Sequence, residues 1–224
     1  GDFALAAGQM SGMSAAMERI GEPRRMRRRC RLRAETGVAA LPMKGSAQTG
    51  DTMAIRQVEG GVLLLLSDGM GSGPAAHRES ASAVALYGDL LSIGFDHADA
   101  VTSVNRLLLS GTEEAYATLD AARVNLASGE ATFVKLGAPP AFILREGKVK
   151  TVYAEALPLG ILPKADPGVS RAGLRPGDAV ILMTDGLCEA LGTDLLASVA
   201  ELVAAANTAQ DAADALLRRG AERG

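Results

Sequence analysis

The chain has 224 residues, of which 48% are hydrophobic and 22% charged, a composition that excludes a disordered or collagen-like protein and predicts one main core. Its net charge of −3 and its 3% content of aromatic residues argue against binding to nucleic acid or to an anionic membrane. The longest apolar runs, Val62–Leu66 and Ala179–Met183, have five residues and are too short to cross a bilayer. Cys30 and Cys188 are predicted to be free thiols in a reducing compartment.

The beginning of the chain, residues 1–23, is predicted to be a regulatory or linker segment that precedes the main domain, residues 24–224. Apolar residues recur at helical spacing between Phe3 and Ile20, and Gly21–Pro23 end the pattern, which predicts an amphipathic helix. Because methionine packs adaptably, the methionines on this helix fit either a partner protein or the core of the chain's own domain.

An arginine-rich segment follows, with seven arginines between Arg24 and Arg33. A run of this kind can bind phosphate groups. The alternation of arginine with leucine and alanine over Arg31–Ala34 favours a different interpretation, a half-buried strand whose arginines face water.

Strands and two helices are predicted for the middle of the chain. Glycine permits the positive φ that tight hairpins need, and three glycine-containing turns separate strand-like runs, at Gly60-Gly61, Ser128-Gly129 and Glu146-Gly147. Helical patterns cover Pro74–Ile93 and His97–Ser110, with Pro74 suited to the first helical position and Asp96 to the N-cap. The inward-facing positions of these helices are predicted to be Ala83, Val84, Tyr87, Leu91, Val101, Val104 and Leu108.

Further helices are predicted near the end of the chain. Apolar residues at helical spacing form one face over Leu195–Val203, and Thr208 with Asp211 is typical of a capping box at the start of a last helix. Strands, two helices, more strands and then helices predict an α+β fold in which helices are layered on antiparallel sheets.

One short repeat in the sequence carries candidate chemistry. Val62–Gly69 and Ala179–Gly186 have the same form, five apolar residues followed by Ser or Thr, Asp and Gly. Each copy is predicted to deliver an aspartate, Asp68 or Asp185, from the end of a rigid central strand buried on both faces. Thr49-Gly50-Asp51 precedes another predicted strand and could turn Asp51 toward the same place.

Three aspartates in one pocket predict a divalent metal centre, because their carboxylates would otherwise repel one another. Magnesium and manganese prefer carboxylate, carbonyl and water ligands, so Asp51, Asp68, Asp185 and the carbonyl of Gly69 are the candidate ligands. Two such ions sharing Asp68 would bind a bridging water and lower its pKa toward neutrality. The resulting hydroxide would attack phosphorus without a side-chain nucleophile.

Several ordered motifs resemble the phosphatase domain of the stage II sporulation protein E family, a PPM-type class of metal-dependent serine/threonine phosphatases. The resemblance covers about Ala47 to Ala190 and rests on five motifs: Ser67–Gly73, Glu113–Asp120, Lys135–Pro139, Leu157–Ile161 and Asp185-Gly186. It implies an α-β-β-α sandwich of two antiparallel sheets flanked by helices, with two manganese or magnesium ions at one end.

The resemblance also implies a substrate and site residues. The family acts on a phosphoserine of a small anti-anti-sigma factor, and dephosphorylation leads to release of a sporulation sigma factor. The family's metal aspartates match Asp51, Asp68 and Asp185, and its carbonyl ligand matches Gly69. The fragment is expected in the cytoplasm without membrane contact, while the full-length protein would be anchored upstream in the membrane at the division septum; a homodimer is left open.

The family usually has one more metal aspartate in an Asp-Asp-Met-Thr motif after the last helix. The sequence ends at Gly224 before any such motif, which predicts a weakened metal site between Asp68 and Asp185 and a missing last strand. In the resembled family the two helices after the Asp68 motif switch activity by moving the metal loop, with Gly71 and Gly73 as hinges; the alternative is that they are ordinary core helices.

Competing functions are tested against the same residues. A dinucleotide-binding glycine motif would need a glycine where Pro74 stands, and a haloacid-dehalogenase phosphatase would need an aspartate at Leu66. A phosphatase fold that works mainly as a binding module with little turnover stays open. His77 and His97 are predicted to be helix-surface histidines, because two histidines do not make a zinc site.

Overall fold

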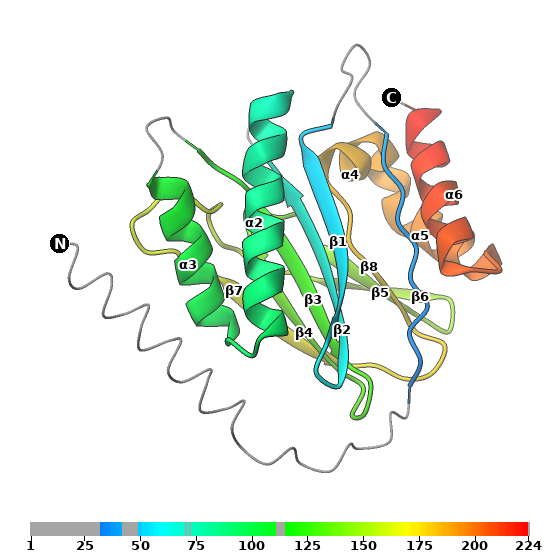
Figure 1. The fold of residues 1–224 in the computed structure, drawn as a ribbon. Helices are drawn as coiled ribbons and strands as arrows, with labels where there is room; N and C mark the ends of the chain where they lie inside the picture. The colour runs from blue at the N-terminus through cyan, green and yellow to red at the C-terminus, as the bar shows by residue number, and fades with distance from the viewer. Residues whose placement is uncertain (1–31, 42–48, 70, 72, 111–114, 224) are drawn as a thin grey trace.

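The protein is described by a computed structural model over residues 32–41, 49–69, 71, 73–110 and 115–223, and these form two antiparallel sheets stacked between two layers of helices (Figure 1). In strand order, the larger sheet consists of β1 (Asp51–Val58), β2 (Gly61–Asp68), β3 (Leu119–Asn125), β4 (Glu130–Leu136) and β7 (Gly168–Gly173). The smaller sheet consists of β6 (Lys148–Val152), β5 (Ala141–Arg145) and β8 (Ala179–Ile181). The predicted α+β sandwich is confirmed.

The three predicted hairpins are present. β1 pairs with β2, β3 with β4 and β5 with β6, each antiparallel and each joined by a short turn. Gly60, Gly129 and Gly147 have φ angles of 71°, 77° and 74°, a region that favours glycine because it lacks a Cβ. Local turn chemistry therefore fixes these strand pairings.

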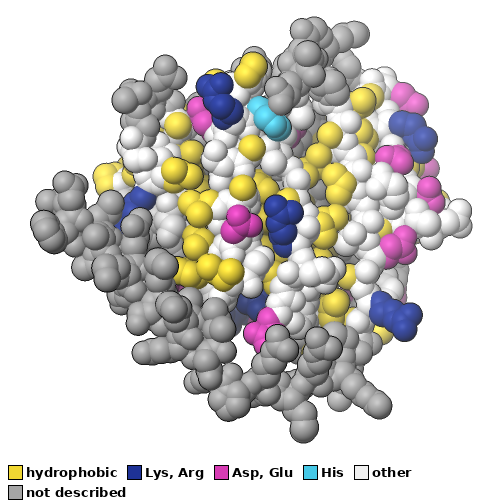
Figure 2. Space-filling view, viewed as in Figure 1, with side chains coloured by type: hydrophobic (Ala, Val, Ile, Leu, Met, Phe, Trp, Pro, Cys, Tyr) yellow, Lys and Arg dark blue, Asp and Glu magenta, His cyan; other side chains and the backbone are white. Residues whose placement is uncertain are grey.

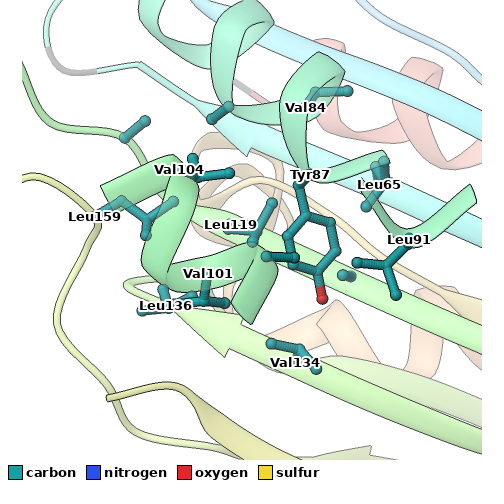
Figure 3. Packing of buried hydrophobic residues seen from close by; sticks show 14 of the residues in the cluster. Leu65, Val84, Tyr87, Leu91, Val101, Val104, Leu119, Val134, Leu136 and Leu159 are labelled. Carbon is teal, nitrogen blue, oxygen red and sulfur yellow. The ribbon is translucent and has the colours of Figure 1, made fainter. Parts of the chain in front are cut away.

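Helices α2 (Pro74–Ser92) and α3 (His97–Leu109) cover the outer face of the larger sheet (Figure 1). Pro74 occupies the start of α2, and the Asp96 side chain caps α3 by accepting a hydrogen bond from the Asp99 N–H at 2.9 Å. All seven predicted inward positions are buried, and Figure 3 shows Val84, Tyr87, Leu91, Val101 and Val104 packed over the sheet residues Leu65, Leu119, Val134 and Leu136. Burial of each valine or leucine among them contributes about 2 kcal/mol.

Three helices pack on the smaller sheet: α4 (Asp185–Leu191), α5 (Leu195–Ala205) and α6 (Ala209–Ala221), with a short 3-10 turn at Gly192–Asp194 between the first two. The predicted face of α5 is present, since Leu195, Val199, Leu202 and Val203 join the cluster around Phe142. Thr208 caps α6 by accepting a hydrogen bond from the Asp211 N–H at 3.0 Å, as predicted.

A second apolar layer lies between the two sheets and fixes their stacking. Phe133 of β4 and Ala122 of β3 face Ile143 of β5 across this layer, and all three are buried. Since neighbouring residues of a strand point to opposite faces, Val134 and Leu136 of β4 face the helices instead. The sheets therefore meet at a packed seam, and the candidate site lies at one end of it.

The structure corrects two sequence predictions. β8 was expected to be a central strand buried on both faces, but it has three half-buried residues and pairs, within the described residues, only with β5. Leu32–Ala34 form no strand; Leu32 donates a single backbone hydrogen bond to the Leu126 carbonyl. The predicted helix over Phe3–Ile20, the linker segment 1–23 and most of the arginine run lie outside the described residues.

In the part of the chain that the structure describes, no helix combines the length and the apolar character needed to cross a membrane. The longest, α2, has 19 residues and includes charged positions on its outer face. Figure 2 shows this face, where hydrophobic side chains are interspersed with charged ones.

Candidate metal centre

Two of the predicted aspartates come from the first hairpin. Asp51 begins β1, Asp68 ends β2, and the two residues are direct cross-strand partners. The Asp51 N–H donates to the Thr49 hydroxyl at 3.1 Å, which orders the turn into β1. Facing residues in such a pair have Cβ atoms about 5 Å apart, so the hairpin itself brings both carboxylates to one end of the sheet.

Thr118, just before β3, holds the end of β2 from the other side. The Asp68 N–H donates to the Thr118 hydroxyl at 2.8 Å, and the Thr118 N–H donates to the Asp68 carbonyl at 2.9 Å. The buried Ser67 hydroxyl donates to the Thr118 carbonyl at 2.6 Å. Ser67 and Thr118 thus hold the end of β2 against the start of β3. Thr118 lies inside the Glu113–Asp120 motif, but sequence analysis did not predict this contact.

Gly69 and Gly50 open the space beside Asp68. A Cβ on Gly50 would lie 3.5 Å from both the Asp68 Oδ1 and the Gly69 carbonyl oxygen, so these two oxygens face the same small hollow. A carboxylate and a carbonyl oxygen directed into one hollow form the oxygen-donor set that magnesium and manganese prefer. The residues present therefore fit a hard divalent ion.

The first turns of α2 pack directly on these glycines. A Cβ on Gly69 would lie 1.9 Å from the Ala76 carbonyl oxygen, so no other residue fits there without a backbone shift. The Ser80 hydroxyl lies 2.5 Å from the Gly50 carbonyl and 2.7 Å from the Thr52 hydroxyl. α2 therefore contacts both edges of the hollow.

The third aspartate, Asp185, reaches the same end of the seam from the other sheet. It is the first residue of α4, not the last residue of a strand, and the Gly186 N–H donates to its Oδ1 at 2.7 Å. Asp68 and Asp185 line a common pocket of about 20 Å³. The structure thus brings Asp51 next to Asp68 across the hairpin, and Asp185 next to Asp68 across the pocket.

The carboxylates repel one another where they meet. The pKa of Asp68 is raised from its ordinary 3.8 to about 7, first by burial and then by the charge of Asp51, a hydrogen bond with Asp51 and the charge of Asp185. The ionised form of the Asp68 carboxylate is therefore destabilised in this environment, unless a cation compensates its charge. Within the described ranges, however, no three His, Cys, Asp or Glu side chains are already arranged to hold an ion together, so the predicted ligand set stays a prediction.

The family comparison decides what kind of domain this is. The model of the stage II sporulation protein E family matches residues 58–224, which is most of the chain. The chain belongs to this family.

Stage II sporulation protein E of Priestia megaterium is 34% identical over 157 residues, covering 69% of this chain and 27% of that protein. The Bacillus subtilis protein is 35% identical over 159 residues, covering 70% of this chain and 19% of that protein. The chain therefore spans less than a third of these relatives.

The fold agrees with this membership. The solved PP2C phosphatase domain of stage II sporulation protein E from Bacillus subtilis, with a fragment of its regulatory domain, aligns with a TM-score of 0.76 and 29% identity. The alignment covers 86% of this chain and 59% of that one. The chain thus corresponds to the PP2C phosphatase domain of the stage II sporulation protein E family, with the α-β-β-α arrangement that the motifs predicted.

Sequence analysis missed a buried ion pair in this family member. Lys135 Nζ lies 2.6 Å from Asp120 Oδ1, and their side chains are 0% and 1% exposed. Burial lowers the pKa of Lys135 and raises that of Asp120 to about 6, while each charge works against the shift of the other. The available signal was that Asp120 stands between Leu119 and Ala121 in β3, and Lys135 between Val134 and Leu136 in β4.

The predictions for the other polar residues have mixed outcomes. His77 and His97 are both half-buried on their helices. His97 Nδ1 lies 2.6 Å from the Tyr87 hydroxyl, and desolvation lowers the pKa of His97. Cys188 is a free thiol, as predicted, whereas Cys30 lies outside the described residues.

A larger groove of about 390 Å³ lies between β1, β8 and α6. Its lining is mainly apolar and lacks all three aspartates, so the groove is separate from the candidate metal centre.

Proposed function

We propose that this chain is a metal-dependent protein serine phosphatase that removes phosphate from a phosphoserine of a small anti-anti-sigma factor, leading to activation of a sporulation sigma factor. The proposal is carried by two pairings, Asp51 with Asp68 across the β1–β2 hairpin and Asp68 with Asp185 along one pocket, in a domain of the stage II sporulation protein E family. The raised pKa of Asp68 supports it, because a cation would offset both causes of that shift, the burial of the carboxylate and the nearby charges of Asp51 and Asp185.

Two divalent ions, manganese or magnesium, would be held by Asp51, Asp68, Asp185 and the Gly69 carbonyl. When bound, the ions supply Lewis acidity toward the phosphoryl oxygens and acidify the attacking water. Asp51 and Asp68 would supply the charge that retains the ions, and Asp185 would bind from the opposite side of the pocket. No side chain has to act as nucleophile, and the hydroxyl of Ser67 is already engaged with Thr118.

The substrate and location follow from the family resemblance. The acidic centre would take a phosphoserine-containing protein loop, whose phosphate becomes attractive to the site only after the ions are bound. We propose that residues 24–224 form a phosphatase domain on the cytoplasmic side of the membrane. Residues 1–23 would be a linker helix that connects this domain to upstream parts anchored in the membrane. A homodimer is compatible with this placement.

Regulation through α2 and α3 is part of the proposal. The Gly69–Ala76 contact and the hydrogen bond from Ser80 to the Gly50 carbonyl connect α2 to both sides of the hollow beside Asp68. A shift of α2 would therefore move the Gly69 carbonyl and the turn before Asp51. Gly71 and Gly73, with φ angles of 85° and 83°, would allow the intervening loop to follow.

The test is phosphate release from a phosphoserine-containing anti-anti-sigma factor as manganese is titrated. Wild type is expected to release phosphate only with the metal, and Asp68→Asn is expected to lose at least about 100-fold in rate. Arg145→Met serves as the control and should keep most of the rate, since Arg145 pairs with Asp178 away from the three aspartates. Manganese binding without phosphate release would favour the alternative, a phosphatase-fold binding module with little turnover. Metal-independent release that survives Asp68→Asn would refute the proposal.

A further inference from the structure

The buried pair of Asp120 and Lys135 lies inside the seam between the two sheets. Asp120 follows Leu119 on β3, and Lys135 lies between Val134 and Leu136 on β4. Those apolar neighbours pack toward the helices, so the alternation of side chains places both charged groups on the inter-sheet face. The two residues are direct cross-strand partners, which explains how the lysine reaches the carboxylate without leaving the core.

The pair is not explained by stability alone. Removing two charges from water costs several kcal/mol each, and replacing such a pair with apolar residues is often neutral or stabilising. Beyond the ion pair, neither carboxylate oxygen of Asp120 has a hydrogen-bond partner among the described residues. A buried carboxylate with acceptor capacity left over usually meets a bound water or ligand.

The neighbouring pocket supplies such a place. Asp120 lines the pocket of about 20 Å³ together with Asp68, Asp185 and the threonines Thr118 and Thr184. A polar cavity needs about 10–15 Å³ to hold one water molecule, so this one accommodates a single water. Asp120 forms its inner wall, because Asp120 is 1% exposed whereas Asp185 is on the surface.

We propose that Asp120 is a positioning residue of the metal centre: one water in this pocket donates hydrogen bonds to Asp120 and to the carboxylate of Asp68 or Asp185, and so orients the ligands. Lys135 stabilises the ionised form of Asp120 and compensates its charge. Asp120 therefore adds no fourth uncompensated negative charge to those of the three aspartates. Mutation of residues that orient metal ligands through hydrogen bonds commonly lowers metal affinity 10- to 100-fold. The inference rests on the proposed metal role of Asp68 and Asp185, and its test is separable from that role.

The experiment compares two double variants of the full 224-residue chain, since a single change would leave one buried charge unpaired. Asp120→Val with Lys135→Met removes the pair and the acceptor. Asp120→Asn with Lys135→Met removes both charges but keeps an amide oxygen that can accept from the water. Manganese affinity is measured by calorimetry, and the metal-free Tm of each variant reports folding.

The Val/Met variant is expected to bind manganese at least about 10-fold more weakly while its metal-free Tm stays near wild type. The Asn/Met variant is expected to recover most of the affinity. The matched control is Arg145→Met, which removes the ion pair with Asp178 at the other end of β5; it should lower the Tm and leave manganese affinity unchanged.

Two outcomes would overturn the inference: wild-type manganese affinity in the folded Val/Met variant, or equal losses in the Val/Met and Asn/Met variants. Failure of the Val/Met and Asn/Met variants to fold would also overturn it, because the pair would then be needed for the core itself. Asp68→Asn is measured alongside. If it leaves manganese binding intact, the proposed metal role of Asp68 fails, independently of Asp120.

Discussion

Two segments that look alike in the sequence, Val62–Gly69 and Ala179–Gly186, have different structures. The first forms β2, an eight-residue strand between β1 and β3. The second contains only the three residues of β8, followed by a short connection and then α4, which begins at Asp185. The comparison shows that a repeated motif can deliver two carboxylates to one site by different routes, one from a rigid strand and one from the start of a helix.

The difference follows from what flanks each segment. β2 is hydrogen-bonded on both edges and packs against helices on one face and the other sheet on the opposite face. β8 pairs with β5 alone among the described residues, so its backbone has fewer partners to keep it extended. Three sets of substitutions test this asymmetry, beginning with the largest expected effect.

The two glycines that end the repeat should respond differently to alanine. In Gly69→Ala the new Cβ would lie 1.9 Å from the Ala76 carbonyl oxygen. The clash must displace either α2 or the backbone at Gly69. Because displacement of a catalytic group by about 1 Å can cost 100-fold, we expect manganese-dependent phosphatase activity to fall about 100-fold. Gly186→Ala meets no atom within 4 Å and should keep its activity. Equal activities of the two variants would contradict the described packing.

Shortening an apolar side chain should destabilise the domain more in β2 than in β8. Leu63 of β2 is fully buried, and Leu63→Ala should lower the free energy of unfolding by about 3 kcal/mol. Val180 of β8 is half-buried, and Val180→Ala should cost about 1 kcal/mol. Urea denaturation of both variants measures these values. A Val180→Ala loss as large as that of Leu63→Ala would mean that β8 is as central as its sequence suggests.

The smallest effect is a pH dependence of the metal-free protein. Asp68 has a pKa of about 7 when folded, against 3.8 ordinarily, so the folded state retains a proton that the unfolded chain has lost. The free energy of unfolding should therefore fall as pH rises from about 4 to about 7. Since Asp68 is only half-buried, we expect about 1 kcal/mol, or about 3 °C in Tm.

Asp68→Asn should abolish this decline and raise the Tm at pH 8 in the presence of EDTA. Asp185→Asn is the matched comparison, because it removes an exposed carboxylate from the other copy of the repeat. Scanning calorimetry from pH 4 to 8 measures both variants. A metal-free Tm at pH 8 that Asp68→Asn leaves unchanged would show that the carboxylates do not strain the fold.

Local patterns in the sequence predicted most of the helices and hairpins, because caps, glycine turns and periodicity act over a few residues. Pro74, Asp96 and Thr208 all begin helices as expected. The pattern did not reveal that β8 is short, because strand length there depends on which strand lies beside it. The same holds for Asp120 and Lys135, which become partners only when β3 pairs with β4. The proximity of Asp51 to Asp68 was predictable, since both lie at the open end of one hairpin.

The seam between the sheets has a consequence for how the domain would respond to its ions. Asp51 and Asp68 belong to one sheet, whereas Asp185 follows the last strand of the other. Their arrangement therefore exists only while the two halves of the sandwich are closed on each other. By thermodynamic linkage, cations bound at the proposed site would favour the closed state over every opened one. Resistance to proteolysis would then measure metal loading even when no substrate is present.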